Sequence, residues 1–295
     1  MSQPERYGLA PYKTRNFYLN TTDGESAIGV WHILPHSVYR EAAAHGAGSI
    51  TSANRQLFAP LAPLGKDVFE ESFKKRDTVI YFHGNAVLPD SKACNRAISY
   101  RVGTYKALST KLDVNVIAID YRGYGDSTGS PSEDGLLSDA TTVWDYISVH
   151  SRKDIDGETD REEGKSIVVM GHSLGTAKTK APVLIIHAKD DHDIPASHSK
   201  RLYEMLSKSR SPEGAAPRTR VVKREGWGSV MMHVPEETRR GDGGSSDIGG
   251  GVAWFEADHG AHNRVGGGEG VIQLMQAFLQ SETPSDLAYN ILGDI

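Results

Sequence analysis

The sequence predicts an α/β fold, in which a mostly parallel sheet is flanked by helices. Two observations support this class, and the composition adds that a core can form. Strand-like and helix-like stretches alternate along the chain, as they do where helices cross over between parallel strands. Four strand candidates between residues 78 and 187 are short and almost entirely apolar, which is typical of strands covered on both faces. Hydrophobic residues make up 38% of the 295 positions, enough for a sizeable core.

The expected elements follow in chain order. Strands are expected at residues 16–19, 28–33, 78–82, 115–119, 166–170, 183–187 and 252–255. Apolar residues at helical spacing predict helices over residues 100–111, 136–150, 195–207 and 269–279. Two stretches without such patterning, about 36–76 and the glycine-rich 239–251, are expected to be flexible insertions. We expect a single domain over residues 1–295, with its core at about 13–280.

The composition excludes several classes of protein. With 33 Lys and Arg against 38 Asp and Glu, the net charge of −5 disfavours nucleic-acid binding, which needs concentrated positive charge. The chain has no run of 18 apolar residues, and its first residues lack the pattern of a signal peptide. A single cysteine, Cys94, allows no internal disulfide and fits a reducing compartment. We therefore expect a cytoplasmic protein whose membrane contact, if any, is peripheral.

A nucleophile pattern follows the strand expected at 166–170. The sequence Gly171-His-Ser173-Leu-Gly175 has the form G-x-S-x-G and comes directly after that strand. A serine on a sharp turn from strand to helix needs small residues two positions before and after it, because larger side chains would collide there. We therefore predict that Ser173 is a catalytic nucleophile. The competing interpretation is an ordinary surface turn flanked by glycines.

Two further motifs follow expected strands. After the strand at 78–82, His83-Gly-Asn-Ala lets the backbone turn close to an active site, so the N–H groups of Asn85 and Leu174 are predicted to form an oxyanion hole. Each such donor stabilises the transition state by about 3–4 kcal/mol. The glycine-rich stretch 120–133 lacks both G-x-G-x-x-G and the lysine of a phosphate-binding loop. We therefore interpret it as structural.

The other members of a catalytic triad are expected later in the chain, in the order Ser, Asp, His. Asp191 is the predicted acid, because Asp-x-x-Ile-Pro places it at the mouth of its strand, and Asp190 is the alternative. His262 is the predicted base, because it lies nearer the start of the last helix, and His259 is the alternative. We expect no metal at 190–193, since four consecutive side chains cannot converge on one ion, and no cofactor.

Together these motifs resemble the α/β-hydrolase superfamily, and more narrowly its α/β-hydrolase domain-containing lysophosphatidylserine lipases and monoacylglycerol lipases. The resemblance covers most of residues 13–208 and the tail, through Lys13–Asn16, Ile28–His32, Tyr81–Ala86, Asp120–Ser127, Gly129–Glu133, Met170–Thr176, Leu184–Asp191 and Gly260–His262. It implies an α/β-hydrolase fold and a serine hydrolase that acts on single-chain lipid esters. Members of this group often carry a membrane anchor, so the alternative location is the surface of the endoplasmic reticulum membrane.

The connection after the nucleophile motif departs from the family pattern. Ser173 and Asp191 are 18 positions apart. The fold places a helix, a strand and a second crossover there, which need roughly 30 residues at minimum. Only residues 176–180 separate the motif from Ala181-Pro182, where a helix cannot continue. We therefore expect the fold to lack one strand and its crossover helices, as after altered splicing or an error in a gene model.

The expected function is hydrolysis of a carboxylic ester, in a lysophospholipid or a monoacylglycerol, through an acyl-enzyme. A thioesterase or a serine peptidase would use the same triad. A catalytically silent hydrolase-like protein is the alternative of a different class, and the short connection favours it. The expected partner is a small lipid ester, and the sequence defines no oligomeric state. We also expect poor solubility or a low melting temperature, because the short connection leaves apolar strands uncovered.

Overall fold

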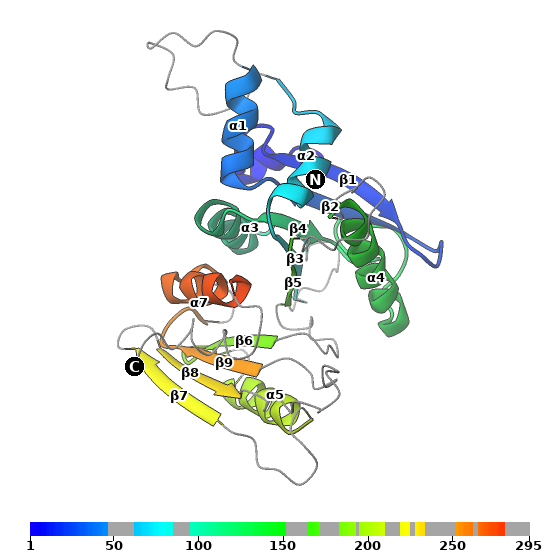
Figure 1. Ribbon diagram of the computed structural model, residues 1–295. Coiled ribbons are helices and arrows are strands. Elements are labelled where there is room, and N and C mark those ends of the chain that lie inside the picture. Colours follow the sequence, from blue (N-terminus) through cyan, green and yellow to red (C-terminus); the bar gives the residue numbers. More distant parts are fainter. Residues whose placement is uncertain are drawn as a thin grey trace, which may run out of the picture. The chain divides into compact units, whose positions relative to one another are not determined.

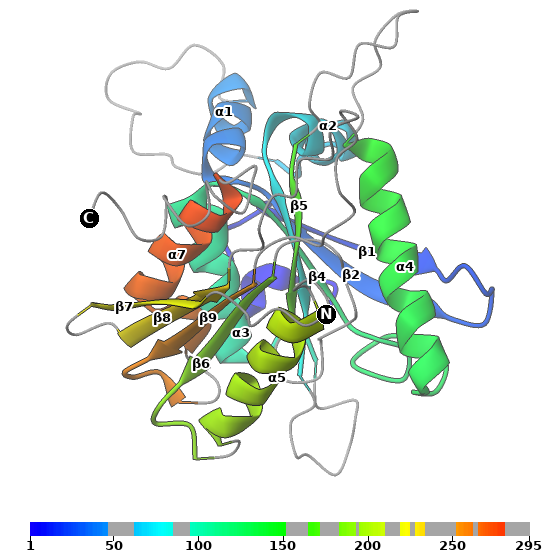
Figure 2. The same cartoon turned by 60° about the horizontal axis from the view of Figure 1, so that its bottom comes forward.

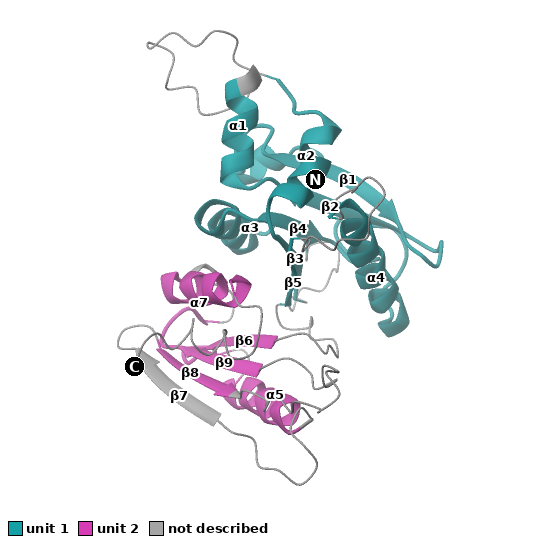
Figure 3. Cartoon of the chain, viewed as in Figure 1, with its two compact units in different colours: residues 1–176 teal, residues 177–295 magenta. Residues whose placement is uncertain are grey.

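The structure is a computed structural model of the 295-residue chain. It describes residues 1–46, 62–84, 95–151, 165–171, 183–192, 195–209, 219–224, 228–233, 252–261 and 265–280. The chain divides into two compact units, residues 1–176 and residues 177–295 (Figure 3). The expected single domain over residues 1–295 stays a prediction.

The first unit contains a five-stranded sheet in the order β1-β2-β4-β3-β5 (Figure 1). Its strands are β1 Thr14–Asn20, β2 Ala27–Ile33, β3 Thr78–Phe82, β4 Asn115–Ile119 and β5 Ile167–Gly171. β1 and β2 form an antiparallel hairpin, and β2 pairs antiparallel with β4, whereas β4, β3 and β5 run parallel. The α/β class is confirmed. The strands are parallel where the site motifs begin, but the hairpin makes this sheet mixed rather than mostly parallel.

Helices lie on both faces of this sheet (Figures 1 and 2). They are α1 His36–Gly46, α2 Lys66–Lys75, α3 Ser99–Ala107, which continues as a π-helical turn over Leu108–Leu112, and α4 Glu133–His150. A 3-10 turn spans Pro4–Tyr7. On one face, Phe73 of α2 and Ile147 of α4 share a buried core with Ile80 of β3. On the other face, Tyr105 of α3 packs edge-on against Tyr81, with ring centroids 5.0 Å apart.

Residues 36–76, expected to be a flexible insertion, contain the helices α1 and α2 instead. These helices take part in a small buried cluster that consists of Leu34, Val38, Tyr39 and Phe69. Sequence patterning misses both helices because each buries only a few apolar residues among many charged or small ones. Residues 47–61 of this stretch, and the whole glycine-rich stretch 239–251, lie outside the described residues.

The second unit contains a four-stranded sheet in the order β6-β9-β8-β7. Its strands are β6 Val183–Ala188, β7 Thr219–Arg224, β8 Gly228–His233 and β9 Val252–Ala257. β6 and β9 run parallel, and the other two pairs are antiparallel. Helices α5 Ala196–Ser209 and α7 Glu269–Leu279 lie on opposite faces of this sheet, and a 3-10 turn at Val265–Gly267 precedes α7 (Figures 1 and 2). Sequence patterns do not predict the β7–β8 hairpin, because its short strands mix apolar with polar residues.

The glycine-rich stretch 120–133 begins with a buried ion-pair network. Asp120 and Asp126 both pair with the guanidinium of Arg96, which is fully buried. The backbone N–H of Arg96 also donates to Asp120 Oδ1 over 2.6 Å. Burial raises the pKa of Asp120 to about 6, and the charge of Arg96 opposes that shift. The acidic residues of this stretch therefore fix the chain after β4, in agreement with a structural interpretation.

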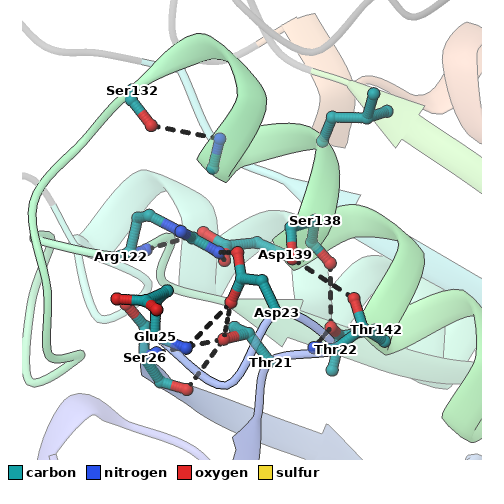
Figure 4. A network of polar contacts seen from close by, with 12 residues as sticks. Thr21, Thr22, Asp23, Glu25, Ser26, Arg122, Ser132, Ser138, Asp139 and Thr142 are labelled. Carbon is teal, nitrogen blue, oxygen red and sulfur yellow. Dashed lines mark hydrogen bonds and ion pairs between the residues drawn. The ribbon is translucent and has the colours of Figure 1, made fainter.

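The same stretch also ties the β1–β2 turn to α4 (Figure 4). Arg122 Nη2 pairs with Asp139 of α4 at 2.8 Å and with Asp23 of the turn at 2.7 Å. Ser132 caps α4, because its Oγ accepts the N–H of Gly135 over 3.1 Å. Arg122 and Ser132 thus have structural partners in the first unit.

β5 is the least covered strand of the first sheet. Every residue of β3 and β4 is buried, whereas none of β5 is, and Val169 is 47% exposed. Leu137 and Trp144, which lie seven residues apart on one face of α4, are exposed as well. Within the described residues β5 pairs only with β3 and β6 only with β9. Both observations fit the expected loss of one strand and its crossover helices between β5 and β6.

We expect these uncovered apolar side chains to promote self-association of the chain. Replacing Leu137 and Trp144 together by Gln should lower light scattering on heating, because it removes exposed apolar surface without removing buried contacts. Inserting several dozen residues that supply the missing strand and helices between Ala177 and Lys178 should have the same effect.

Val143→Gln is the matched control on the same helix, because Val143 is fully buried and its replacement should lower the melting temperature. A wild-type chain that is soluble and melts cooperatively would show that the short connection is tolerated.

A second prediction concerns His32 of β2, which is fully buried. Its ring stacks on Phe73 with centroids 4.4 Å apart, and its Nε2 lies 2.9 Å from Asn115 Oδ1. Burial lowers the pKa of His32 from 6.5 to about 3. As the pH falls below 6.5, the unfolded chain takes up this proton first. The free energy of unfolding should therefore decrease by about 1.4 kcal/mol per pH unit through this group.

Urea unfolding of the wild type and of His32→Gln at about pH 7 and pH 5 measures this contribution. The glutamine keeps an amide donor but has no ionisable group, so its stability should decline less steeply with falling pH. Equal declines in the two proteins would show that His32 does not carry the effect.

Candidate active site

The nucleophile and oxyanion segments follow neighbouring parallel strands. The last paired residues of β3 and β5 are Phe82 and Gly171. Because the carboxyl ends of parallel neighbours lie at the same edge of a sheet, the two following segments start side by side. Asn85 is three residues beyond Phe82, and Ser173 is two beyond Gly171. Ser173, Leu174 and Asn85 themselves lie outside the described residues and stay predictions.

The carbonyl of Gly84, directly before the predicted oxyanion donor, is held by two groups. Arg101 Nη2 donates to it over 2.8 Å, and Nδ1 of His83 lies 3.0 Å from it. The Arg101 side chain is fully buried, and its Nη1 donates to the carbonyl of Asn95 over 2.7 Å. Arg101 therefore fixes the backbone on both sides of residues 85–94. Sequence patterns do not identify this arginine, because basic side chains are mostly exposed.

The histidine of the His-Gly motif is a structural residue. His83 is buried, and its ring lies 4.9 Å from that of Tyr121 and 5.3 Å from that of Tyr124. Its Nε2 is 3.5 Å from Asp120 Oδ1. With its ring packed and both nitrogens near acceptors, His83 helps to hold the start of the oxyanion segment.

The acid and base segments follow the parallel pair of the second unit. β6 and β9 end at the paired residues Ala188 and Ala257. Asp191 is three residues beyond Ala188, and His262 is five beyond Ala257. Both segments thus leave the same edge of this sheet. His262 lies outside the described residues and stays a prediction.

The Asp191 carboxyl is almost fully buried, with 4% of its side chain exposed. Its Oδ2 lies 3.2 Å from Nε2 of His187, which is near the end of β6. The Asp191 N–H donates to the carbonyl of Ala188 over 3.2 Å and closes the turn after the strand. A buried, partnered carboxylate is the kind of group that orients a catalytic imidazole. Nothing in the sequence identifies His187 as its partner.

Asp190, the alternative acid, uses both carboxylate oxygens on the backbone. Oδ1 accepts the N–H of Ala261 over 2.7 Å, and Oδ2 accepts that of Gly260 over 3.3 Å. The hydrogen bond from Ala261 is the largest cause that lowers the pKa of Asp190. This geometry favours Asp191 as the acid. The alternative base, His259, is exposed at the surface.

In the described part of the chain, no group of three or more His, Cys, Asp or Glu side chains could hold a metal ion. No helix drawn from those same residues combines the length and the hydropathy needed to cross a membrane.

Comparisons with known proteins find relatives of one kind. Lysophosphatidylserine lipase ABHD12 of Danio rerio is 28% identical over 284 residues, which cover 72% of this chain and 64% of the relative. The protein of the same name from Xenopus tropicalis is 35% identical over 179 residues, 60% of this chain and 35% of the relative. Protein ABHD12B of Homo sapiens is 30% identical over 60% of this chain and 38% of the relative. The resemblance to lysophosphatidylserine lipases is therefore confirmed, although the chain spans less than two thirds of each relative.

Solved structures give more distant similarities. An α/β serine hydrolase without a lid from Xanthomonas campestris has a TM-score of 0.40 and 13% identity, over 67% of this chain and 81% of the other. An α/β serine hydrolase homologue from Coxiella burnetii has a TM-score of 0.44 and 12% identity, over 90% and 95%. No family model matches the chain.

Proposed function

We propose that this chain is a serine ester hydrolase. The observation that carries the proposal is that each of four segments follows the carboxyl end of a parallel strand. The oxyanion and nucleophile segments leave the carboxyl ends of β3 and β5, and the acid and base segments leave those of β6 and β9. In α/β proteins the carboxyl ends of parallel strands are where ligands bind. The relatives named as lipases support the same chemistry.

In the proposed reaction, Ser173 Oγ attacks the carbonyl carbon of the ester and gives its proton to His262. Asp191 orients the imidazole and stabilises it in the charged form. The N–H groups of Asn85 and Leu174 stabilise the negative oxygen. His262 then gives the proton to the departing alcohol, which leaves an acyl-serine. Water attacks this ester with His262 as base, so the fatty acid leaves and the serine is restored.

The proposed substrate is a single-chain lipid ester, in a lysophospholipid or a monoacylglycerol. Its support is the printed name of the relatives, lysophosphatidylserine lipase. Since such esters reside in lipid surfaces, we also propose peripheral contact with a membrane. A thioesterase or serine peptidase would use the same triad, and a panel of esters, thioesters and peptides separates these substrates.

A catalytically silent protein is the second candidate, and one observation favours it. Eleven residues, 172–182, connect the end of β5 to the start of β6. A single crossover between parallel strands ordinarily needs about a dozen residues. This connection also has to hold the nucleophile turn. If it leaves Ser173 without its base or its oxyanion donors, the chain keeps the motif but loses the chemistry.

Replacing the nucleophile tests the first candidate. With a short-chain nitrophenyl ester as substrate, Ser173→Ala should remove nearly all turnover, by about 10⁴–10⁶-fold, because no other group can form the acyl-enzyme. Ser166→Ala is the matched control, since Ser166 is exposed just before β5 and should be dispensable. Turnover that survives in Ser173→Ala would exclude this serine, whereas an inactive but folded wild type would favour the silent protein.

The two histidines after β9 give a second test. His262→Ala should abolish ester hydrolysis, because the base and the later general acid are lost together. His259→Ala should keep turnover within about tenfold of the wild type. The His259 side chain is exposed, and substitutions of exposed side chains usually have small effects. The opposite pattern would assign the base to His259.

A further inference from the structure

The turn after β6 and the loop after β9 are joined by a series of contacts. The backbone N–H of Lys189 donates to the carbonyl of Ala257 over 2.8 Å. The Lys189 ammonium pairs with Asp258 at 2.6 Å, and this pair is exposed. Asp190 follows with its two hydrogen bonds to the backbone of residues 260 and 261. The contacts thus advance along the loop toward the position of the predicted base.

The Asp190 contact differs from the others because it fixes consecutive peptide groups. Each carboxylate oxygen accepts one N–H, from Gly260 and from Ala261. Both residues have positive φ, +139° at Gly260 and +47° at Ala261. The left-handed conformation is unfavourable for alanine, so an interaction must hold it in place. Asp190, in the turn after β6, accepts one hydrogen bond from Ala261 and one from Gly260.

The beginning of this loop, at Gly260, also packs closely against its end, at Val265. A Cβ atom at Gly260 would lie 2.7 Å from the Cα atom of Val265, which no ordinary packing allows. The backbone at residue 260 therefore passes directly beside residue 265. The segment between them, residues 262–264, contains the predicted base. Asp190 and the Val265 contact thus fix the two residues before this segment and the residue after it.

We propose that Asp190 is the positioning residue of the general base: its carboxylate fixes the conformation of Gly260 and Ala261, the two residues directly before His262 in the sequence. This inference rests on the proposed function, because it assigns a role relative to that histidine. In this proposal the two adjacent carboxylates have different roles. Asp191 acts on the base itself, whereas Asp190 acts on the backbone that carries it.

The ionisation of Asp190 supports this role. The N–H groups of Ala261 and Gly260 lower its pKa, the first more than the second. Asp190 is therefore charged at neutral pH, and hydrogen bonds from N–H groups to a charged acceptor are stronger than those to a neutral one. The groups that face it from the base loop are His259 and, through Lys189, Asp258.

The experiment compares Asp190→Ala and Asp190→Asn with the full-length wild type. We expect kcat for a nitrophenyl ester to fall about 100-fold in Asp190→Ala, because a displacement of about 1 Å at the base costs that much. KM should stay within about threefold, since Asp190 binds no substrate. Asp190→Asn keeps one acceptor oxygen, so its kcat should lie between those of the wild type and Asp190→Ala. Lys189→Met, which removes the neighbouring exposed ion pair, is the matched control and should change kcat by less than about threefold.

Rescue separates positioning from a general loss of structure. Ala261→Gly removes the strain of the left-handed conformation, because glycine adopts positive φ freely. In the Asp190→Ala background it should recover part of the lost kcat. A loss of turnover as complete as in Asp191→Ala, without rescue, would overturn the proposal, because a residue that only fixes the backbone should leave partial activity. Unchanged kcat in Asp190→Ala would overturn it as well.

Hydrogen exchange tests the clamp independently of catalysis. Peptides that cover residues 258–261 should exchange faster in Asp190→Ala than in the wild type or in Lys189→Met. If the wild type has no hydrolase activity, the proposed function fails, but faster exchange still establishes the clamp. Equal exchange in all three proteins would overturn the clamp, whatever the activity of the wild type.

Discussion

The parallel pairing of neighbouring strands is the constraint on which the rest of this structure depends. β3 and β5 end together at Phe82 and Gly171, and β6 and β9 end together at Ala188 and Ala257. Residues that are far apart in sequence therefore leave a sheet at one edge, two segments from each pair. One pair carries the nucleophile and oxyanion segments, and the other carries the acid and base segments. Each half of the proposed site is thus a property of one strand pair.

Polar side chains then hold the backbone where these strands end. Arg101 donates a hydrogen bond to the carbonyl of Gly84, and Asp190 accepts hydrogen bonds from the N–H groups of residues 260 and 261. Nε2 of His187 lies 3.2 Å from the Asp191 carboxylate. A buried polar group that loses its partner costs about 1–3 kcal/mol, so the contacts of the buried Arg101 and Asp191 side chains favour one conformation of the chain around them. The sequence motifs predict the reacting groups, and these contacts fix backbone groups close to them in the chain.

Much of the fold follows from the sequence because it depends on local pattern. The seven expected strands all form, and their ends lie within two residues of the predicted ones. Short apolar runs are typical of strands in a sheet that helices cover. The β7–β8 hairpin and the helices α1 and α2 do not follow, because their apolar faces are narrow and gain their stability from tertiary packing. Asp191 is the acid that the motif predicts, and this role stays a prediction. Its contact with His187, and that of Arg101 with Gly84, depend on side chains that meet only in the folded chain.

The proposed reaction needs residues from both strand pairs, and eleven residues, 172–182, connect β5 of one pair to β6 of the other. The most direct test is the reaction of the folded, full-length chain with a fluorophosphonate, followed by mass spectrometry of the adduct. A serine is modified by this reagent only when its base and oxyanion donors activate it. The account predicts one adduct, on Ser173. A folded chain in which Ser173 stays unmodified, or in which another residue carries the adduct, would contradict it.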